Sequence, residues 1–394
     1  MKNKDDQQGN GLMSLRMFRE LAEEKGGNCI SIYIPTSRAG EKVISKHAQK
    51  KLKNKLKETS SALVEAGTGK KETAALLKPA EEMLEDDNFW RNQSDGLAIF
   101  INKNGMRSFT LPVDFEERVY TGDHFYLLPL FPFFNDDGEF YLLALSQKEV
   151  KLYECSKNHI TGIVIDDLIP GSLEDVVGYD YEDKSLQHRT GHGGDAGAMF
   201  HGQGRSKDED KDETARYFRA VDKGLMKLLA DDKKPMVLAC VEAHFPVYQQ
   251  ITSYPGLFDS FISGSPDKED PLVLHSEAWL LIKEFFRKQR ENKIKTFRKL
   301  SGTSKTAVVP DDIVIASVDG RIDTLFVASG KDKYGTYDAE KRKLNISGGE
   351  RKGRDVSLFN FSAVNTFLNG GWVYISTGDK MPLENTGVNA ILRY

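Results

Sequence analysis

The sequence contains few cysteines and no long apolar run. Its three cysteines, Cys29, Cys155 and Cys240, are far apart and odd in number, which argues against a disulfide framework and against a cysteine-based zinc site. We expect buried thiols on strands in a reducing compartment. No stretch reaches the ~18 consecutive apolar residues of a membrane span, and the polar first residues lack the apolar core of a signal peptide. These absences predict a cytoplasmic protein without a membrane partner.

The motifs of common self-contained enzymes are also missing. The sequence has no G-x-S-x-G, no P-loop, no dinucleotide-binding fingerprint after a strand and no C-x-x-C. We therefore expect no cofactor and no complete active site within the chain. The net charge of -4 gives no general attraction to nucleic acid, so any RNA contact must come from local basic faces.

The composition predicts a soluble globular protein of several domains. A hydrophobic content of 39% with 29% charged residues allows a sizeable core, and 394 residues suit two or three domains. Turn-forming residues cluster at 135–138 and 264–267. We predict a disordered tail at 1–13, an N-terminal α/β domain at 14–136, a middle domain at 137–266 and a C-terminal α/β domain at 267–394.

The N-terminal segment predicts an α/β pattern with a lysine-rich helix. A helix at 15–25, an alternating strand at 29–34, a helix at 41–65, a further helix up to Met83 and a strand at 97–101 are expected. In the helix at 41–65, Ile44, Ala48, Leu52 and Leu56 form an apolar stripe. Around it lie the candidate RNA-binding residues Lys46, Lys50, Lys53 and Lys57. These lysines form either a phosphate-binding surface or a solvated helix face.

The middle segment predicts a mixed sheet flanked by helices. Three short strands at 140–146, 150–153 and 160–165 suggest an antiparallel meander, and a helix at 212–230, a strand at 236–241 and a helix at 245–252 follow.

The C-terminal segment predicts an α/β sandwich. It begins with a long basic helix at 272–300, and strands are expected at 313–318, 324–328, 372–376 and 390–394 with a helix at 363–368.

The most unusual stretch is the glycine-rich segment 187–205, QHRTGHGGDAGAMFHGQGR. It holds six glycines and three histidines and precedes a charged helix. Such a composition cannot bury an apolar face, so we expect a long mobile loop of the kind that carries function. Its residues His201, Gly202, Gln203 and Gly204 are the candidate catalytic group, since a Gly-Gln pair presents a backbone N–H and a side-chain amide with little steric hindrance.

Other residues near the loop allow more than one interpretation. Arg205, Lys207, Arg216 and Arg219 could contact an RNA backbone, or the last two could pair with acidic residues in the first turns of their own helix. Loop histidines could hold a metal, although a flexible loop does so at a large ordering cost. Asp166 and Asp167 suit either a turn or a metal-dependent nuclease, and adjacent strand residues are poorly placed to share one ion.

The order of these segments resembles the bacterial archaeo-eukaryotic release factor family. The resemblance rests on FRELAEEKGGNCISIYIPT near the start, DHFYLLPLFPFF before the first boundary, the Gly-Gln loop ahead of a charged helix, IVIASVDGRIDTLFVASG and the final GVNAILRY. This family is related to class 1 release factors, to the rescue factor Pelota and to a hibernation factor. The resemblance implies three α/β domains, with an RNase H-like middle domain and a last domain similar to kink-turn-binding ribosomal proteins.

The resemblance also implies a function on the ribosome. A protein of this kind enters the A site of stalled or idle ribosomes, where its Gly-Gly-Gln loop reaches the peptidyl-transferase centre. Its partners are rRNA and tRNA, with a translational GTPase as a further candidate. Here Gly202 and Gln203 match the second Gly and the Gln, whereas His201 occupies the place of the first Gly. The stop-codon-reading motif Asn-Ile-Lys-Ser is missing, so decoding is not expected.

Two other functions remain open from the sequence alone. One is a self-contained metal-dependent nuclease or hydrolase, and the other is a non-enzymatic interaction protein with a disordered docking loop.

Overall fold

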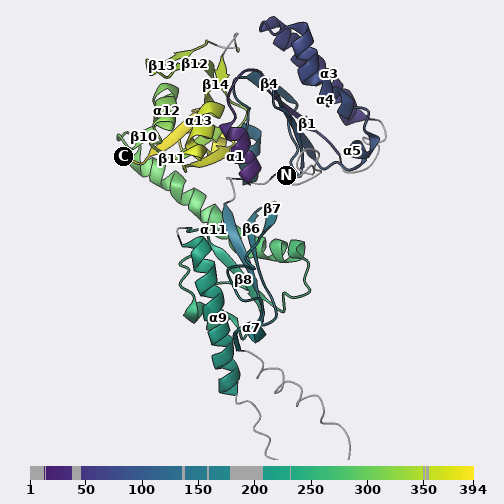
Figure 1. Ribbon diagram of the computed structural model, residues 1–394. Helices are drawn as coiled ribbons and strands as arrows, with labels where there is room; N and C mark the ends of the chain where they lie inside the picture. Colours follow the sequence, from purple (N-terminus) through teal and green to yellow (C-terminus); the bar gives the residue numbers. More distant parts are fainter. Residues whose placement is uncertain are drawn as a thin grey trace, which may run out of the picture. The chain divides into compact units, whose positions relative to one another are not determined.

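The protein divides into two compact units. Unit 1 comprises Met1–Asp136 and Lys288–Tyr394, and unit 2 comprises Asp137–Arg287. The computed structural model describes residues 13, 15–37, 46–134, 138–157, 159–177, 207–230, 232–348, 351 and 355–394 (Figure 1). The division into three domains stays a prediction beside this finding of two units.

The first half of unit 1 is a four-stranded antiparallel sheet in the order β3-β2-β1-β4. Its strands are β1 (Cys29–Pro35), β2 (Gly96–Asn102), β3 (Gly105–Leu111) and β4 (Arg118–Gly122). Ile30, Ile32 and Ile34 of β1 face the helices α3 (His47–Glu65) and α4 (Lys70–Met83), where Leu52 and Leu56 are buried against them. The predicted apolar stripe is confirmed at these two leucines. The described residues of this half also form α1 (Leu15–Glu23), α5 (Asp87–Arg91), η2 (Leu128–Leu130) and α6 (Phe131–Phe134).

The second half of unit 1 is a mixed sheet in the order β10-β16-β11-β15. Its strands are β10 (Thr306–Ala307), β11 (Ile322–Ala328), β15 (Trp372–Ser376) and β16 (Val388–Leu392), and only the pairing of β11 with β15 is parallel in these described strands. The helices α12 (Pro310–Val318) and α13 (Leu358–Leu368) pack on each other, and η3 (Gly378–Lys380) follows β15. A small sheet joins β12 (Tyr334–Asp338), β13 (Lys343–Ile346) and β14 (Val356–Ser357).

The two halves of unit 1 share one hydrophobic core. The ring of Phe18 on α1 contacts Phe367 on α13 edge-to-face at 5.0 Å between centroids. Asn360 on α13 ties the halves together by polar contacts, because its Oδ1 accepts from Leu127 N at 2.7 Å and its Nδ2 donates to Phe125 O at 2.9 Å. Asn360 is 3% exposed, so these bonds satisfy backbone groups that water cannot reach.

Unit 2 is built on a five-stranded mixed sheet in the order β7-β6-β5-β8-β9. The strands β5 (Glu139–Leu145), β6 (Val150–Ser156) and β7 (His159–Ile163) form the predicted antiparallel meander, and β8 (Met236–Cys240) and β9 (Ile262–Ser263) add in parallel. Alternate residues of β5 are buried on both faces, which is typical of a central strand. The predicted mixed sheet with flanking helices is confirmed.

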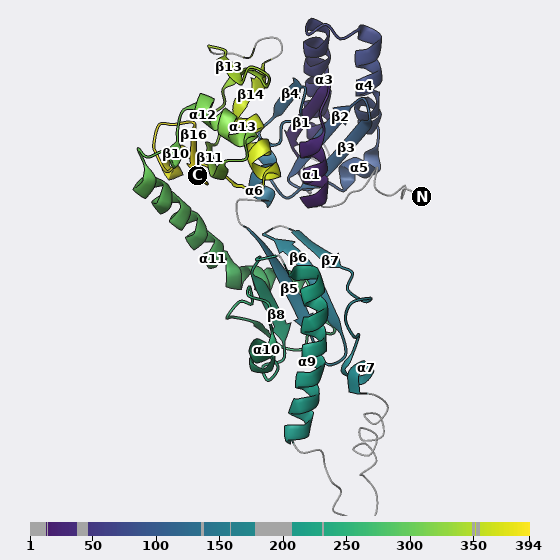
Figure 2. The same cartoon turned by 60° about the vertical axis from the view of Figure 1, so that its left-hand side comes forward.

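Helices cover both faces of this sheet (Figure 2). One face packs against α9 (Lys207–Leu229), α10 (Phe245–Ile251) and α7 (Leu173–Val177). The other packs against the first part of α11 (Pro271–Leu300) through Ala278, Ile282 and Phe286. In the part of the chain that the structure describes, no helix combines the length and apolar character needed to cross a membrane.

Several sequence-based boundaries were wrong. The predicted strand at 313–318 is the second part of α12, because Pro310 occupies the first turn with Asp311 and Asp312 and the following apolar run lacks a distinctive period. The helix expected from 212 already begins at Lys207 as α9. The strands β3, β4, β12 and β13 were not predicted.

The cysteine prediction is confirmed in its structural part. Cys29, Cys155 and Cys240 are free and buried, and they lie on β1, β6 and β8. Burial raises the pKa of the Cys240 thiol to about 12 and that of Cys29 to about 11, so neither is a nucleophile at neutral pH.

Candidate functional site

The predicted loop residues lie outside the described residues. This applies to His201, Gly202, Gln203, Gly204 and Arg205, and to the other loop histidines His188 and His192. Lys207 is the first residue of α9, and its side chain is not described either. The structure does describe the two elements that border this segment, α7 before it and α9 after it.

Gln147 connects both bordering elements to the central strand of unit 2. Its backbone oxygen accepts a hydrogen bond from Leu173 N of α7 at 2.7 Å, and its side-chain Nε2 donates to Thr214 Oγ1 of α9 at 2.9 Å. Gln147 lies two residues after the end of β5, in a turn that Ser146 stabilises, because Ser146 Oγ accepts hydrogen bonds from Lys148 N and Glu149 N. The two roots of the glycine-rich segment are therefore fixed to one turn, and Figure 2 shows α7 next to α9.

A second polar anchor holds the later part of α9. The buried carboxylate of Asp222 accepts from Thr252 Oγ1 at 2.8 Å, Ser253 N at 3.0 Å and Ser253 Oγ at 2.6 Å. Three hydrogen bonds satisfy most of the acceptor capacity of this carboxylate in its buried position. The rotation of α9 about its own axis is thus set by Asp222 as well as by its apolar face, on which Tyr217, Phe218 and Val221 are fully buried.

The opposite face of α9 carries a row of cations, which we call the α9 cationic stripe. It consists of Arg216, Arg219, Lys223 and Lys227, all exposed. Their spacing of three or four residues places them on one side of the helix. Within the described residues none of these four forms an ion pair, including with Asp212 or Glu213. The alternative that Arg216 and Arg219 neutralise those two acids is therefore not what the structure contains.

Sequence reasoning missed half of this stripe. Lys223 and Lys227 continue the spacing of Arg216 and Arg219 by one and two turns, and that periodicity was the signal that could have identified them. The RNA-binding role of Arg216 and Arg219 stays a prediction.

A hollow of about 540 Å³ lies beside these anchors, at the carboxyl ends of β5 and β8. Ligands often bind at this edge of an α/β sheet. Here the lining mixes Lys148 with the acids Glu174 and Asp267, so it has no strong preference for an anion. His244 also lines it, and burial lowers the pKa of its imidazole, which is therefore neutral at pH 7.

The other candidate metal ligands are not brought together in the described chain. Asp166 and Asp167 are exposed in a turn closed by the hydrogen bond from Leu168 N to Ile165 O at 2.9 Å. This is the turn position that was one of their two interpretations. Among the residues that the structure describes, no group of three or more His, Cys, Asp or Glu side chains could hold a metal ion.

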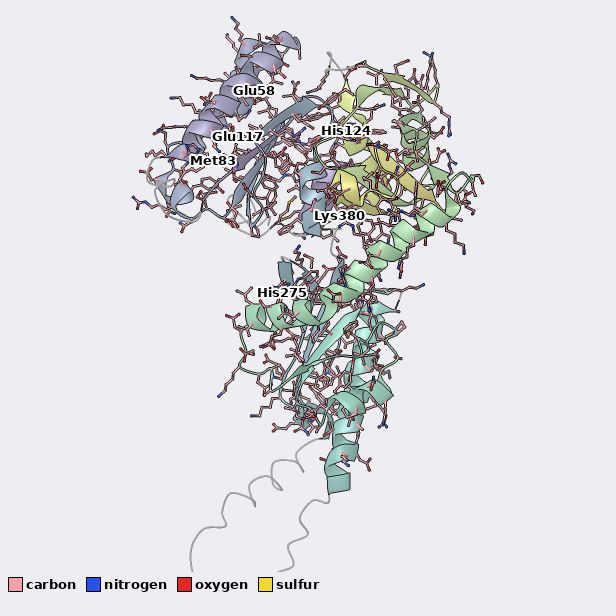
Figure 3. All side chains as sticks on the ribbon, turned by 180° about the vertical axis from the view of Figure 1, so that it is seen from behind. Glu58, Met83, Glu117, His124, His275 and Lys380 are labelled. Atoms are coloured by element: carbon pink, nitrogen blue, oxygen red, sulfur yellow. The ribbon has the colours of Figure 1, made fainter. Side chains whose placement is uncertain are left out.

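The lysines of α3 fall into two classes. Lys46 pairs with Asp87 at 3.1 Å, Lys51 with Glu117 at 3.0 Å and Lys55 with Glu58 at 2.8 Å, and Figure 3 labels Glu58 and Glu117 at this helix. By contrast, the exposed Lys50, Lys53 and Lys57 have no ion-pair partner in the described ranges. Three of the four predicted RNA-binding lysines of α3 thus remain available to an anion.

Several cations of the basic helix α11 are engaged within the protein and are not free to contact an RNA backbone. Arg290 donates to Ile375 O at 3.0 Å, Lys293 pairs with Asp323 at 2.7 Å and Arg298 donates to Pro382 O at 3.1 Å. These three cations hold the last turns of α11 to the C-terminal sheet of unit 1. These three side chains therefore stabilise the fold.

Comparison with known proteins finds a family to which the middle of the chain is similar. Residues 140–284 match the sequence model of bacterial archaeo-eukaryotic release factor family 7. This interval contains the meander, both roots of the glycine-rich segment, the segment itself and the α9 cationic stripe. No curated protein matches the sequence.

Solved structures with similarity to the chain include archaeal and yeast proteins. The archaeal translation termination factor aRF1 is 14% identical over 96% of each chain with a TM-score of 0.24. Archaeal Pelota, from a model of ribosome-bound Pelota and ABCE1, is 9% identical over 76% of this chain and 77% of its own, with a TM-score of 0.35. Dom34 of S. cerevisiae, described as a translation termination-like factor interacting with Hbs1, is 11% identical over 71% of this chain and 75% of its own, with a TM-score of 0.30. These three likenesses are too distant to carry an argument about function.

The family match agrees with the resemblance predicted from the sequence and locates it. Through residues 140–284 the chain is similar to the bacterial archaeo-eukaryotic release factor family.

Proposed function

We propose that this protein is a ribosome-associated factor that occupies the A site of stalled or idle ribosomes. In that position His201, Gly202, Gln203 and Gly204 extend toward the peptidyl-transferase centre. The observation that carries the proposal is the unpaired α9 cationic stripe, which directly follows the Gly-Gln segment within the family-matched interval.

The stripe suits a contact with an RNA backbone. From Arg216 to Lys227 it extends about 16 Å along the helix at ~1.5 Å per residue, enough to reach several phosphates. Cations that neutralise phosphates supply affinity that falls with salt, and they position a protein without reading sequence. Such a contact fits a factor that must bind every ribosome regardless of the message.

The free lysines of α3 provide a second contact of the same kind in unit 1. Lys50, Lys53 and Lys57 follow one face of α3 and have no partner among described residues. We assign rRNA and tRNA as the partners of both surfaces. A translational GTPase is a further candidate partner, as the resemblance of the sequence to the release factor family implies. We place the site of action in the cytoplasm.

The chemistry at the loop depends on the ribosome. Gly202 and Gly204 leave the Gln203 amide and backbone N–H without steric cover, so these groups can approach the ester that links the peptide to tRNA. There they would orient a water whose oxygen adds to the ester carbonyl, and the tRNA 3′-hydroxyl leaves. His201 carries a Cβ where the family has glycine, which narrows the dihedrals available to the loop. A holding function is therefore the alternative within the same proposal.

Sedimentation of ribosomes tests the proposal. The full-length protein is expected in the ribosomal fractions of growing or starved cells at moderate salt. Its presence only at the top of the gradient in both states would refute ribosome association. Chelator-sensitive cleavage of free RNA without ribosomes would favour the nuclease alternative instead.

Peptide release separates the catalytic function from the holding function. On ribosomes that carry labelled peptidyl-tRNA, the wild-type protein should release the peptide. The Gln203→Ala variant should release none, and the His201→Gly variant should release more than the wild type. Ribosome binding with no release by either the wild type or His201→Gly would assign the protein to holding.

A further inference from the structure

Unit 1 contains a cavity that the proposed ribosomal function does not use. It has a volume of about 290 Å³ and lies where α1 and the end of β4 meet α13 and β12. Its lining includes residues from 22–25 and 120–124 of the first half and from 337–365 of the second. This volume is near the lower end of the roughly 300–1,000 Å³ typical of small-molecule sites. Figure 3 labels His124, which lies in its wall.

Aromatic rings form one side of the cavity. The Phe361 ring contacts Tyr337 at 5.9 Å and His124 at 6.1 Å between centroids, the latter edge-to-face at 81°. All three rings line the cavity, together with the apolar side chains of Val318 and Val364. A flat ring system entering the cavity would meet aromatic rings and aliphatic groups.

Polar groups with unused hydrogen-bonding capacity lie in the same walls. His124 Nδ1 is buried without a hydrogen-bond partner among described residues. Asn365 Nδ2 donates to Phe361 O at 2.8 Å, which leaves the side-chain oxygen of Asn365 without a donor from the described chain. The Tyr120 hydroxyl accepts from Ser357 N at 3.0 Å, and its proton has no acceptor there. The cavity thus offers both a donor and an acceptor to the edge of a ring.

One free cation completes the lining. Lys25 is exposed and forms no ion pair within the described ranges. Its ammonium acts on the same ring, since burial first and then the Lys25 charge lower the pKa of His124. Near neutral pH the cavity therefore combines a neutral imidazole with a single positive charge at its open side.

We propose that this cavity binds one nucleotide, with the heterocycle against the aromatic side and the phosphate on Lys25. A nucleobase has a flat face for the Phe361 side and an edge with donors and acceptors for Asn365 and His124, and aromatic stacking of this kind tolerates every base. A purely apolar ligand, such as a phenylalanine side chain, would leave Lys25 and these polar groups unmatched. The nucleotide is either a free mononucleotide or one unstacked residue of single-stranded RNA.

Calorimetric titration of the full-length protein tests the proposal. The probes are adenosine monophosphate, adenosine, inorganic phosphate and a single-stranded oligoadenylate. Adenosine monophosphate is expected to bind more tightly than adenosine, and phosphate alone more weakly than either. Tighter binding of the oligoadenylate assigns the site to RNA, and equal or weaker binding assigns it to the free nucleotide. The proposal would be overturned if neither adenosine monophosphate nor the oligoadenylate bound. It would also be overturned if inorganic phosphate bound as tightly as adenosine monophosphate.

Two substitutions locate the binding in the cavity. Lys25→Glu should lower the affinity for adenosine monophosphate by about tenfold or more, because the reversed charge repels the phosphate. It should change the affinity for adenosine little. Tyr337→Leu should lower the affinities for adenosine monophosphate and for adenosine by a similar factor, because it removes an aromatic ring face. Lys331→Glu is the matched control, an exposed lysine of unit 1 outside the lining, and it should bind as wild type. With circular dichroism spectra unchanged, wild-type affinity in both cavity variants would contradict the assignment.

These experiments need no ribosome. A negative result would not bear on the proposed ribosomal function. Conversely, absence of the protein from the ribosomal fractions would not bear on the nucleotide site.

Discussion

The side chain of Gln147 donates a hydrogen bond to Thr214 Oγ1 at 2.9 Å, while its backbone oxygen accepts from Leu173 N at 2.7 Å. One turn residue thereby holds α7 and α9, the elements on either side of the glycine-rich segment. The proposed function requires both roots of this segment to be rigid relative to the sheet of unit 2. Gln147 supplies that rigidity through two bonds to the end of the central strand β5.

Replacing Gln147 should loosen the start of α9. Gln147→Ala removes the bond to Thr214, and we expect a loss of about 1 kcal/mol in the free energy of unfolding, the usual net contribution of one hydrogen bond. Amide hydrogen exchange should become faster in the turn of α9 around Thr214. Gln249→Ala, at an exposed position of α10, is the control. Equal exchange in the wild type and in Gln147→Ala would show that the bond does not anchor the helix.

Gly224 should not tolerate a larger residue, although it lies within a helix. A Cβ built at this position would be 2.1 Å from Ile169 Cγ2 and 2.4 Å from Leu168 O. The backbone of the turn after β7 cannot move away easily, so Gly224→Ala is expected to destabilise the protein by about 1–3 kcal/mol, as overpacking does, despite the higher helix propensity of alanine.

Gly162 provides the matched control for that substitution. It lies on β7 with no atom within 4 Å of a built Cβ, and Gly162→Ala should leave urea unfolding nearly unchanged. If Gly224→Ala were as stable as Gly162→Ala, α9 would not press on the turn as closely as the structure has it.

Asp332 should make stability depend on pH between about 4 and 6. Burial raises the pKa of its carboxyl to about 6, against about 3.9 for an unfolded aspartate. Ser357 Oγ and Lys333 N donate to Oδ1, while Oδ2 is buried without a partner among described residues. Between the two pKa values the folded state holds a proton that the unfolded chain has lost, so stability falls as pH rises through this range.

Asp332→Asn removes that dependence because an amide does not ionise. Relative to wild type, the variant should gain up to about 2–3 kcal/mol as pH rises from 4 to above 6. Urea unfolding of both proteins across this range gives the difference, in which the other titrating groups cancel. Asp259→Asn, at an exposed position, should show no such gain. A wild-type curve parallel to that of Asp332→Asn would mean that the carboxyl titrates normally.

Secondary structure was predictable wherever one physical signal dominated. The alternation of β1 and the closely spaced strands of unit 2 gave correct strands, and the apolar spacing of α3 correctly placed Leu52 and Leu56 in the core. The signal failed in Ile313–Val318, where an apolar β-branched run is compatible with either structure and only Pro310 favours the helix.

The sequence provides a list of candidate site residues but not their arrangement. Composition singled out the Gly-Gln segment, and basic residues near it were visible in the sequence. Lys55 pairs within its own helix, but the partners of Lys51 and Lys293 are 66 and 30 positions away. Which cations are free therefore depends largely on tertiary contacts. The double contact of Gln147 with α7 and α9 likewise depends on a fold that brings distant segments together, and no local pattern encodes it.

The most direct test of the central claim is the salt dependence of ribosome binding by the α9 cationic stripe. The stripe variant replaces Arg216, Arg219, Lys223 and Lys227 by glutamine. The control makes the same replacement at four exposed lysines of unit 1, namely Lys331, Lys341, Lys343 and Lys380. Cosedimentation of the full-length proteins over a salt series gives each slope of log affinity against log salt concentration. We predict that the stripe variant binds more weakly and that its slope falls by about 3, since each lost phosphate contact removes ~0.7–0.9, while the control matches wild type. Equal affinity and slope in the stripe variant and the control would contradict the account.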